Sequence, residues 1–250
     1  GQITSEDQLA AGIDRSRVNP ATGPVFVAGA EPGDLLEVKI LGFTLAGSGF
    51  SAAMLGGGVL GPRVPRAVTR IIPVTDGACR FLDIPLPARP MIGVIGVAPS
   101  DADGECRTVT PWKHGGNMDT ADIREGSTLY LPVAQAGALL AMGDVHAVMG
   151  DGEMCSTGCE IVAEITVKVD CIKGKASEWP LLATEAHTMV IASGDTLGDA
   201  VTAAADQAVN LQDAIAILKM IVGLDVNGPG RALSPYQAFA ADVDALIEFL

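Results

Sequence analysis

Glycine and proline interrupt this sequence so frequently that long helices cannot account for most of it. The chain carries 30 Gly and 15 Pro in 250 residues, and these two residue types end regular elements and mark turns. Short apolar or alternating runs lie between them, for example residues 35–40, 91–97, 129–133 and 160–170. Such runs are typical of strands. We therefore predict a mainly β fold built from many short strands.

The pattern changes near residue 195. From residue 196 onward Ala, Asp, Leu and Ile recur at helical spacing, and residues 210–224 carry an apolar face through Leu211, Ile215, Leu218 and Val222. We predict a β-rich body over residues 1–195 and a helical C-terminal segment over residues 196–250.

One stretch of the body departs from the strand pattern. Residues 45–61 are rich in Gly and poor in charge, and Gly weakens a strand interior. We interpret this stretch as a loop over a functional site rather than as a strand.

The charge balance limits the partners of the protein. Asp and Glu outnumber Lys and Arg 30 to 16, which gives a formal net charge of −14. Such a surface repels the phosphates of nucleic acid and the anionic surface of a membrane. The sequence also contains no apolar run of about 18 residues that suits a transmembrane helix. We therefore expect neither nucleic acid nor a membrane as a partner.

The cysteines and the N-terminus bear on the cellular compartment. Five Cys at irregular spacing do not form a disulfide framework, which indicates reduced thiols and a cytoplasmic location. Cys155 and Cys159 are close in sequence, but no second Cys or His pair completes a zinc-finger pattern. The chain begins Gly1-Gln2-Ile3 without Met or a signal peptide, and we expect an N-terminal piece to be missing.

Two polar segments, residues 113–120 and 143–153, stand out against the apolar background. Asp144 and His146 are two positions apart, so on a strand their side chains point to the same face. Zinc accepts both carboxylate and imidazole ligands. Asp119 would supply a third ligand from the earlier segment. We therefore predict a metal site formed by Asp119, Asp144 and His146.

Glu153 would act as the general base at such a site, and later as the acid that protonates the leaving group. The residues alone leave another interpretation open. A His hydrogen-bonded to a nearby carboxylate is commoner than a metal ligand, and Asp151-Gly152 is a pair that often only forms a turn.

Several runs resemble motifs of the acetamidase/formamidase family, in the family's order along the chain. These runs are residues 19–25, 29–34, 91–99, 114–119 (His-Gly-Gly-Asn-Met-Asp), 126–133, 143–153 and 172–175, and together in this order they are more specific than any single one. The resemblance covers residues 1–200. It implies an amidohydrolase that converts formamide, acetamide and related short amides to carboxylate and ammonia. It also implies a β-sandwich or barrel body with a smaller α+β part at the C-terminus.

The resemblance places the active site around the same acidic and histidine residues. Asp144, His146 and Glu153 are the expected catalytic residues, and a divalent metal is the expected cofactor, with zinc the first choice and calcium the second. His114, Asn117 and Glu160 are expected to contact the substrate or support the ligands. A small amide is the expected substrate, and a homodimer is the expected assembly.

The two ends of the chain depart from the family pattern. Family members usually begin with a further segment that contains His and acidic residues. The C-terminal part resembles half of a dockerin-type repeat, but residues 206–209 lack the alternating Asp/Asn ligands and the central Gly of a calcium loop. We interpret this part as a helical packing element that does not bind calcium.

A Ser or a Cys nucleophile is the alternative to the metal site. Residues 46–53 resemble the Gly/Ser-rich stretch of serine amidases, but those enzymes need a Lys base and residues 40–112 contain no Lys. Cys155 or Cys159 would have to act with His146, whereas Cys in apolar strands is commonly a small core residue. Both mechanisms are less favoured than the metal site.

A non-catalytic binding module or an inactive family member is the alternative function. A sugar-binding surface needs exposed aromatic side chains, and the chain has only two Trp and two Tyr. The amidohydrolase is therefore the preferred prediction.

Overall fold

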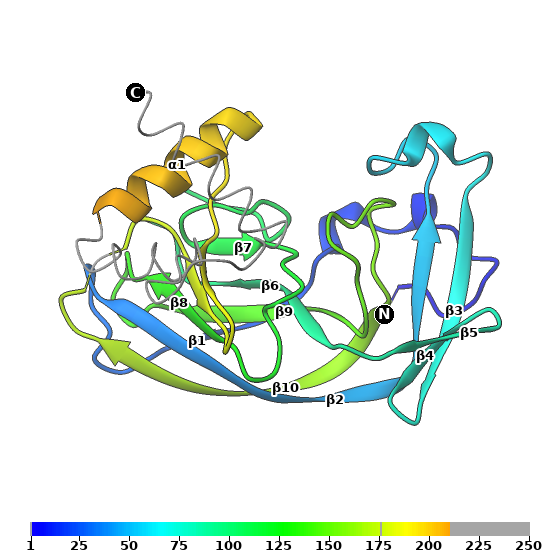
Figure 1. The fold of residues 1–250 in the computed structure, drawn as a ribbon, viewed down its shortest axis with the longest axis horizontal. Coiled ribbons are helices and arrows are strands. Elements are labelled where there is room, and N and C mark those ends of the chain that lie inside the picture. Colours follow the sequence, from blue (N-terminus) through cyan, green and yellow to red (C-terminus); the bar gives the residue numbers. More distant parts are fainter. Residues whose placement is uncertain (1, 176, 211–250) are drawn as a thin grey trace, which may run out of the picture.

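The computed structural model describes residues 2–175 and 177–210 and shows a mainly β protein (Figure 1). This confirms the fold class predicted from the sequence. Twelve strands belong to one hydrogen-bonded sheet system. They are β1 (Ala21–Val25), β2 (Leu35–Ala53), β3 (Val68–Thr75), β4 (Ala78–Phe81), β5 (Ile84–Pro87), β6 (Met91–Gly96), β7 (Gly115–Asn117), β8 (Thr128–Pro132), β9 (Leu140–His146), β10 (Glu160–Ile172), β11 (Leu181–Ala183) and β12 (Thr188–Val190).

Four helical elements complete the described part of the chain. Three are short 3₁₀ turns, η1 (Ala10–Gly12), η2 (Arg15–Arg17) and η3 (Gly61–Arg63), and one is the helix α1 (Leu197–Asn210). Among residues 2–175 and 177–210, no helix has the length and hydrophobicity needed to cross a membrane.

The strands run in the order β12-β11-β8-β2-β10-β9-β6-β7. β10 and β9 pair at one position, Glu160 opposite His146. This bridge divides the path into two layers that share one core. The core cluster contains buried residues from both, among them Leu36 and Val38 of β2, Leu129 of β8, and Ile92 and Ile95 of β6. The arrangement is that of a sandwich rather than a barrel, because the path stays open between β12 and β7 within the described residues.

The long pair β2–β10 joins two regions of the molecule, as the two strands at the base of Figure 1 show. β2 has 19 residues and β10 has 13, and they pair from Leu35 opposite Ile172 to Phe50 opposite Glu160. The first part of β2 also pairs with β8, and its last part pairs with β3. The interpretation of residues 45–61 as a loop is therefore wrong for residues 45–53.

Glycine in this part of β2 permits a close approach of two backbones instead of forming a loop. A Cβ on Gly49 would lie 2.5 Å from the carbonyl oxygen of Glu160, closer than atoms can pack. The register between the strands shifts between Ile161 and Ala163, as at a β-bulge. This contact fixes the start of β10, where Glu160 lies.

Helix α1 covers the first part of the predicted C-terminal segment. Residues 211–250, with the predicted apolar face beyond Asn210 and most of the dockerin-like run, lie outside the described residues. The boundary between a body at 1–195 and a segment at 196–250 therefore stays a prediction.

The buried side chain of Gln207 ties α1 to the sheet. Its Oε1 accepts hydrogen bonds from the backbone N–H groups of Glu178 and Trp179, both at 2.9 Å. Its Nε2 donates to the carbonyl oxygen of Trp179 at 2.8 Å and to the hydroxyl of Ser177. One side chain thus satisfies two backbone donors and a backbone acceptor next to β11.

Asp34 forms a second tie, at the start of β2. Its buried carboxylate accepts hydrogen bonds from Lys173, from the backbone N–H of Gly174 at 3.0 Å and from that of Glu31 at 2.8 Å. The hydrogen bond from Lys173, followed by that from Gly174, holds the pKa of Asp34 far below its usual range. The carboxylate therefore links the start of β2 to the end of β10 in its ionised form.

Replacing Asp34 by Asn should lower the melting temperature by an amount that depends on pH. An unfolded Asp has a pKa of about 3.9. Since the folded-state pKa is lower, the stabilisation by this carboxylate is complete above about pH 5 and is lost as the pH falls below about 4. The difference in melting temperature between the parent and Asp34→Asn, measured by circular dichroism, should therefore shrink between pH 7 and pH 3.

Glu31→Gln is the matched control, because Glu31 also contacts Lys173, at 3.1 Å, but is exposed. A solvent-screened pair contributes little, so this variant should melt like the parent. A difference for Asp34→Asn that stays constant with pH would contradict the role given to the Asp34 carboxylate.

Gln207→Ala should loosen the attachment of α1. It leaves the N–H groups of Glu178 and Trp179 without an acceptor, and one unsatisfied buried group costs about 1–3 kcal/mol. Hydrogen exchange at these two amides should accelerate by roughly 30-fold, which corresponds to about 2 kcal/mol. Asp206→Ala, at the exposed neighbouring position, should leave the exchange rates unchanged. Equal rates in the parent and Gln207→Ala would show that the side chain is not the anchor.

Candidate metal and active site

The candidate site lies where β9 ends and β10 begins. β9 pairs with β6 on one side, with Val94 opposite Gly143, and with β1 and the start of β10 elsewhere. β7 pairs with the other edge of β6 and leads directly into Asp119. The ends of four strands therefore bring chemically active side chains to one place.

Three glycines make room for these side chains. A Cβ on Gly93 would lie 2.8 Å from Asp119 Oδ1 and 3.0 Å from Asp144 Oδ2, and one on Gly158 would lie 2.9 Å from His146 Nδ1. A Cβ on Gly143 would lie 2.1 Å from the carbonyl oxygen of Pro20. The site is packed against bare backbone at all three positions, so a larger residue would displace a proposed ligand or the β1 segment.

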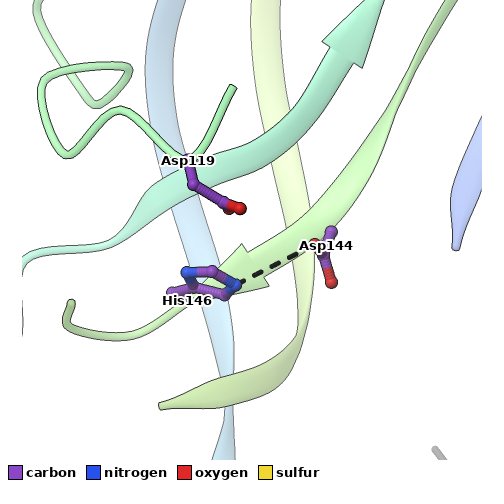
Figure 2. A group of neighbouring side chains, drawn as sticks. All are labelled: Asp119, Asp144 and His146. Carbon is purple, nitrogen blue, oxygen red and sulfur yellow. Dashed lines mark ion pairs between the residues drawn. The ribbon is translucent and has the colours of Figure 1, made fainter. Parts of the chain in front are cut away.

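Asp119, Asp144 and His146, the three predicted metal ligands, lie together. Figure 2 shows Asp144 and His146 on β9 and Asp119 above them on the segment after β7. His146 Nε2 is 4.0 Å from Asp144 Oδ2, and one ligand atom of each residue lies within 4.8 Å of the others. Asp144 and His146 thus lie close together, although Asp144 has a φ of +52° and β9 departs there from the extended conformation on which the one-face prediction rests.

Asp119 provides the test of whether this group suits a cation. Its Oδ1 is buried and has no hydrogen-bond partner among the described residues. Burial of a carboxylate oxygen without a hydrogen-bond donor costs free energy. Coordination of a metal ion would compensate this oxygen. One imidazole nitrogen and two carboxylates are also a donor set that zinc accepts. The residues present fit a divalent ion.

Glu160 and Glu153 border the same histidine. Glu160 Oε2 is 3.2 Å from His146 Nε2, and Glu160 Oε1 accepts a hydrogen bond from Gly158 N–H at 3.0 Å. His146, Glu153 and Glu160 form a second group whose ligand atoms lie within 4.8 Å of one another. Two of the predicted residues outside the ligand trio therefore reach the site.

Met149 contacts the other side of the imidazole. Its sulfur lies 3.2 Å from His146 Nδ1. A thioether only accepts, so this contact places the proton of the neutral ring on Nδ1. Nε2 of the neutral ring then carries no proton, and its lone pair points toward the acidic residues. Metal coordination requires such a nitrogen.

The shared volume shifts the pKa values of its carboxyl groups. Burial, and then the charge of Glu160, raises the pKa of Asp144 to about 7. Burial, and then the charge of Asp119, raises the pKa of Glu153 to about 7. Burial also raises the pKa of Asp119. Each carboxyl group thus resists ionising beside the others, and a bound cation would relieve that repulsion.

Opposite influences act on His146. Burial by itself lowers the pKa of the imidazole, but the hydrogen bond and charge of Glu160, with the charges of Asp144 and Asp119, raise it to about 9. In the metal-free protein the ring therefore carries positive charge and occupies the centre of an acidic group. A metal ion would take over this role, because it competes with the proton for the same nitrogen.

Asn117 reaches the site, accompanied by a residue that the sequence analysis missed. Asn117 Nδ2 donates to Asp119 Oδ2 at 2.6 Å. Asn19 Nδ2 donates to Asp144 Oδ2 at 2.7 Å and to Asn117 Oδ1 at 3.0 Å. Asn19 belongs to one of the family-like runs, but Asn-Pro also marks turns. No local pattern connects it with a residue on β9.

His114, predicted to contact the substrate, lies in different surroundings. It is buried, and its Nδ1 has no hydrogen-bond partner within the described residues. Burial lowers its pKa, opposed by the charge of Asp103 and by none of the four site carboxyl groups. The substrate role of His114 stays a prediction.

The alternative nucleophiles find little support in the structure. Cys159 is buried next to Cys79, and burial raises the pKa of its thiol to about 12. Such a thiol is a poor nucleophile, because the thiolate is the reactive form. Residues 46–53, which resemble a stretch of serine amidases, lie within strand β2.

Comparisons with known proteins agree with this geometry. The sequence profile of the Acetamidase/Formamidase family matches residues 1–103 and 101–193. The formamidase of Methylophilus methylotrophus is 28% identical over 235 residues, which cover 69% of this chain and 57% of that protein. The chain spans 57% to 59% of the length of the curated relatives it matches.

Solved structures show the same fold. The acetamidase of Bacillus halodurans has a TM-score of 0.80 and 44% identity, over 85% of this chain and 72% of that chain. The acetamidase of Yersinia enterocolitica has a TM-score of 0.78 and 30% identity, over 98% of this chain and 72% of that chain. The profile match, the structural similarity and the family-like runs at the site lead to one conclusion: the chain belongs to the acetamidase/formamidase family.

Proposed function

We propose that this protein hydrolyses small aliphatic amides such as formamide and acetamide to the carboxylate and ammonia, with the help of a divalent metal ion. The observation that carries the proposal is the buried, unpartnered oxygen of Asp119 beside Asp144 and His146. The names of the relatives, formamidase and acetamidase, support the substrate class.

Asp119, Asp144 and His146 would hold the metal ion. Zinc is the first choice because the group includes an imidazole, and calcium is the second because it binds carboxylate oxygens. When bound, the ion would polarise the amide carbonyl and lower the pKa of a bound water towards about 7. All other roles fall to the side chains of the chain itself.

Glu153 would be the general base. Its carboxyl group is half-buried beside His146 and Glu160, within the group that holds the proposed ligands. It would take a proton from the attacking water and later deliver it to the departing ammonia, which balances the reaction. Glu160, whose Oε2 lies 3.2 Å from His146 Nε2, would border the ion beside that nitrogen.

Three other expectations belong to the same proposal. Asn117 and Glu160 border the proposed ligands and are available to contact the substrate, and His114 completes the set of proposed substrate contacts. A homodimer and a cytoplasmic location complete the proposal. An inactive or purely binding family member is the alternative, and the assay below separates the two.

Removal of the metal should abolish ammonia release. The protein would be dialysed against a chelator and then supplied with zinc or calcium, with formamide and acetamide as substrates. Activity should fall more than about 100-fold and return with the metal, because water at neutral pH is a weak nucleophile. Asp144→Ala and His146→Ala should lose both the bound metal and the activity.

His187→Ala is the matched control, since this half-exposed histidine pairs with Asp122 and lies outside the proposed ligand set. It should keep both metal and activity. A folded, full-length chain that releases no ammonia with any metal would leave the family assignment intact and would favour the binding or inactive alternative.

Glu153→Gln should separate the base from the ligands. Loss of a general base typically costs about 10²–10⁴-fold in rate, so kcat should fall by that amount while one zinc per chain is retained. Asp151→Asn, at an exposed position of the same loop, should keep the parent rate. A Glu153→Gln protein that no longer binds zinc would identify Glu153 as a ligand instead.

A further inference from the structure

We propose that Asn19 and Asn117 form one hydrogen-bonded unit that positions the carboxylates of Asp119 and Asp144 for the metal ion. We call this unit, Asp119–Asn117–Asn19–Asp144, the amide relay. The inference rests on the metal site of the proposed function. It assigns a positioning role to Asn19, a residue outside the predicted site.

The hydrogen bonds of the relay run in one direction. Asn117 donates to Asp119 at 2.6 Å, and Asn19 donates to Asn117 at 3.0 Å and to Asp144 at 2.7 Å. An ionised carboxylate only accepts, so Asn117 must direct its NH₂ at Asp119. Its carbonyl oxygen then faces Asn19, which must direct its own NH₂ at both neighbours. The two carboxylates thus fix the orientation of both amides.

The relay leaves Asp119 Oδ1 for the ion and directs the Asn19 amide at Asp144 Oδ2. Asp119 Oδ2 is occupied by Asn117, and Oδ1 is the oxygen without a partner. Asp119 Oδ1 and Asp144 Oδ2 lie 2.8 Å and 3.0 Å from the same point, the position of a Cβ on Gly93. Two like charges are therefore held close together, and amide donors oppose their repulsion.

The backbone brings Asn19 to this place. Ala21 of β1 lies opposite Gly143 of β9, one residue before Asp144. The absence of a side chain at Gly143 lets the Pro20 carbonyl approach. Asn19 has a φ of +51°, a left-handed conformation that Asn adopts more readily than most residues. Both the backbone and the side chain at this position thus favour Asn.

A purely structural role would be to fasten the N-terminal segment to the sheet. That task has other contributors. Glu6 accepts from Arg70 at 2.9 Å and from the N–H of Ile71 at 3.2 Å, which ties the same segment to β3. The two roles differ in one respect, because the relay bonds directly to the proposed metal ligands and the Glu6 contacts do not.

A double-mutant cycle read out by zinc affinity tests the relay. The variants are Asn19→Gly, which keeps the left-handed backbone unstrained, Asn117→Ala and the double variant. Zinc alone would be titrated into metal-free protein against a chromophoric chelator, with no substrate present. Loss of a group that supports a metal ligand typically costs about 10–100-fold in affinity. Each single variant should therefore bind zinc at least about 10-fold more weakly.

The double variant should bind zinc about as weakly as either single variant, because removal of one amide already breaks the unit. Glu6→Ala should bind zinc like the parent, even if its melting temperature falls. Circular dichroism would verify that all variants are folded.

Other results would overturn the relay. Parent-like affinity in Asn19→Gly would leave Asn19 a structural tether, and losses that multiply in the double variant would mean two independent contacts. A parent that binds no zinc at this site would remove the basis of the relay. A zinc-binding parent that hydrolyses no amide would refute the proposed function and leave the relay standing.

Discussion

The burial of several carboxyl groups around one imidazole is the constraint on which the rest of the site depends. Asp119, Asp144, Glu153 and Glu160 approach His146 in a volume with little water. Like charges at this distance cannot all persist without compensation. The protein supplies donors from Asn19, Asn117 and the backbone of Gly158. One oxygen of Asp119 is still without a partner, and this remaining imbalance is the reason for placing a cation here.

The sandwich explains why the site forms at this point. The two layers share a core, and within the described residues β10 meets β9 at one position, where Glu160 lies opposite His146. Gly49 lets the backbone of β2 approach Glu160 closely, and β1 brings Asn19 to the end of β9. The long strands β2 and β10, the bulge near Ile161 and the pairing of β1 with β9 are therefore all needed to assemble these side chains.

Part of this could be predicted from the sequence, for physical reasons. Strand alternation has a period of two, so the spacing of Asp144 and His146 indicated neighbouring side chains, but it gave no sign of the left-handed backbone at Asp144, where φ is +52°. The Gly-rich stretch at 45–53 forms part of strand β2, although glycine disfavours strands locally. Pairing with β10 on one edge and with β3 on the other holds it extended, and local sequence does not reveal this pairing. Asn19 could not be found, because its contact with Asp144 spans 125 positions and is set by strand pairing.

The sequence separation within the amide relay has a consequence for the order of events in biosynthesis. Asn19 leaves the ribosome early, but its partners on β7 and β9 follow 98 and 125 positions later, and Glu160 follows later still. Closing so long a loop is slow and entropically costly. A partly synthesised chain therefore has acidic residues but no organised cradle for an ion. Binding of the proposed ion would therefore follow the pairing of β1 with β9, and a bound ion would mark a chain in which these two strands have already met.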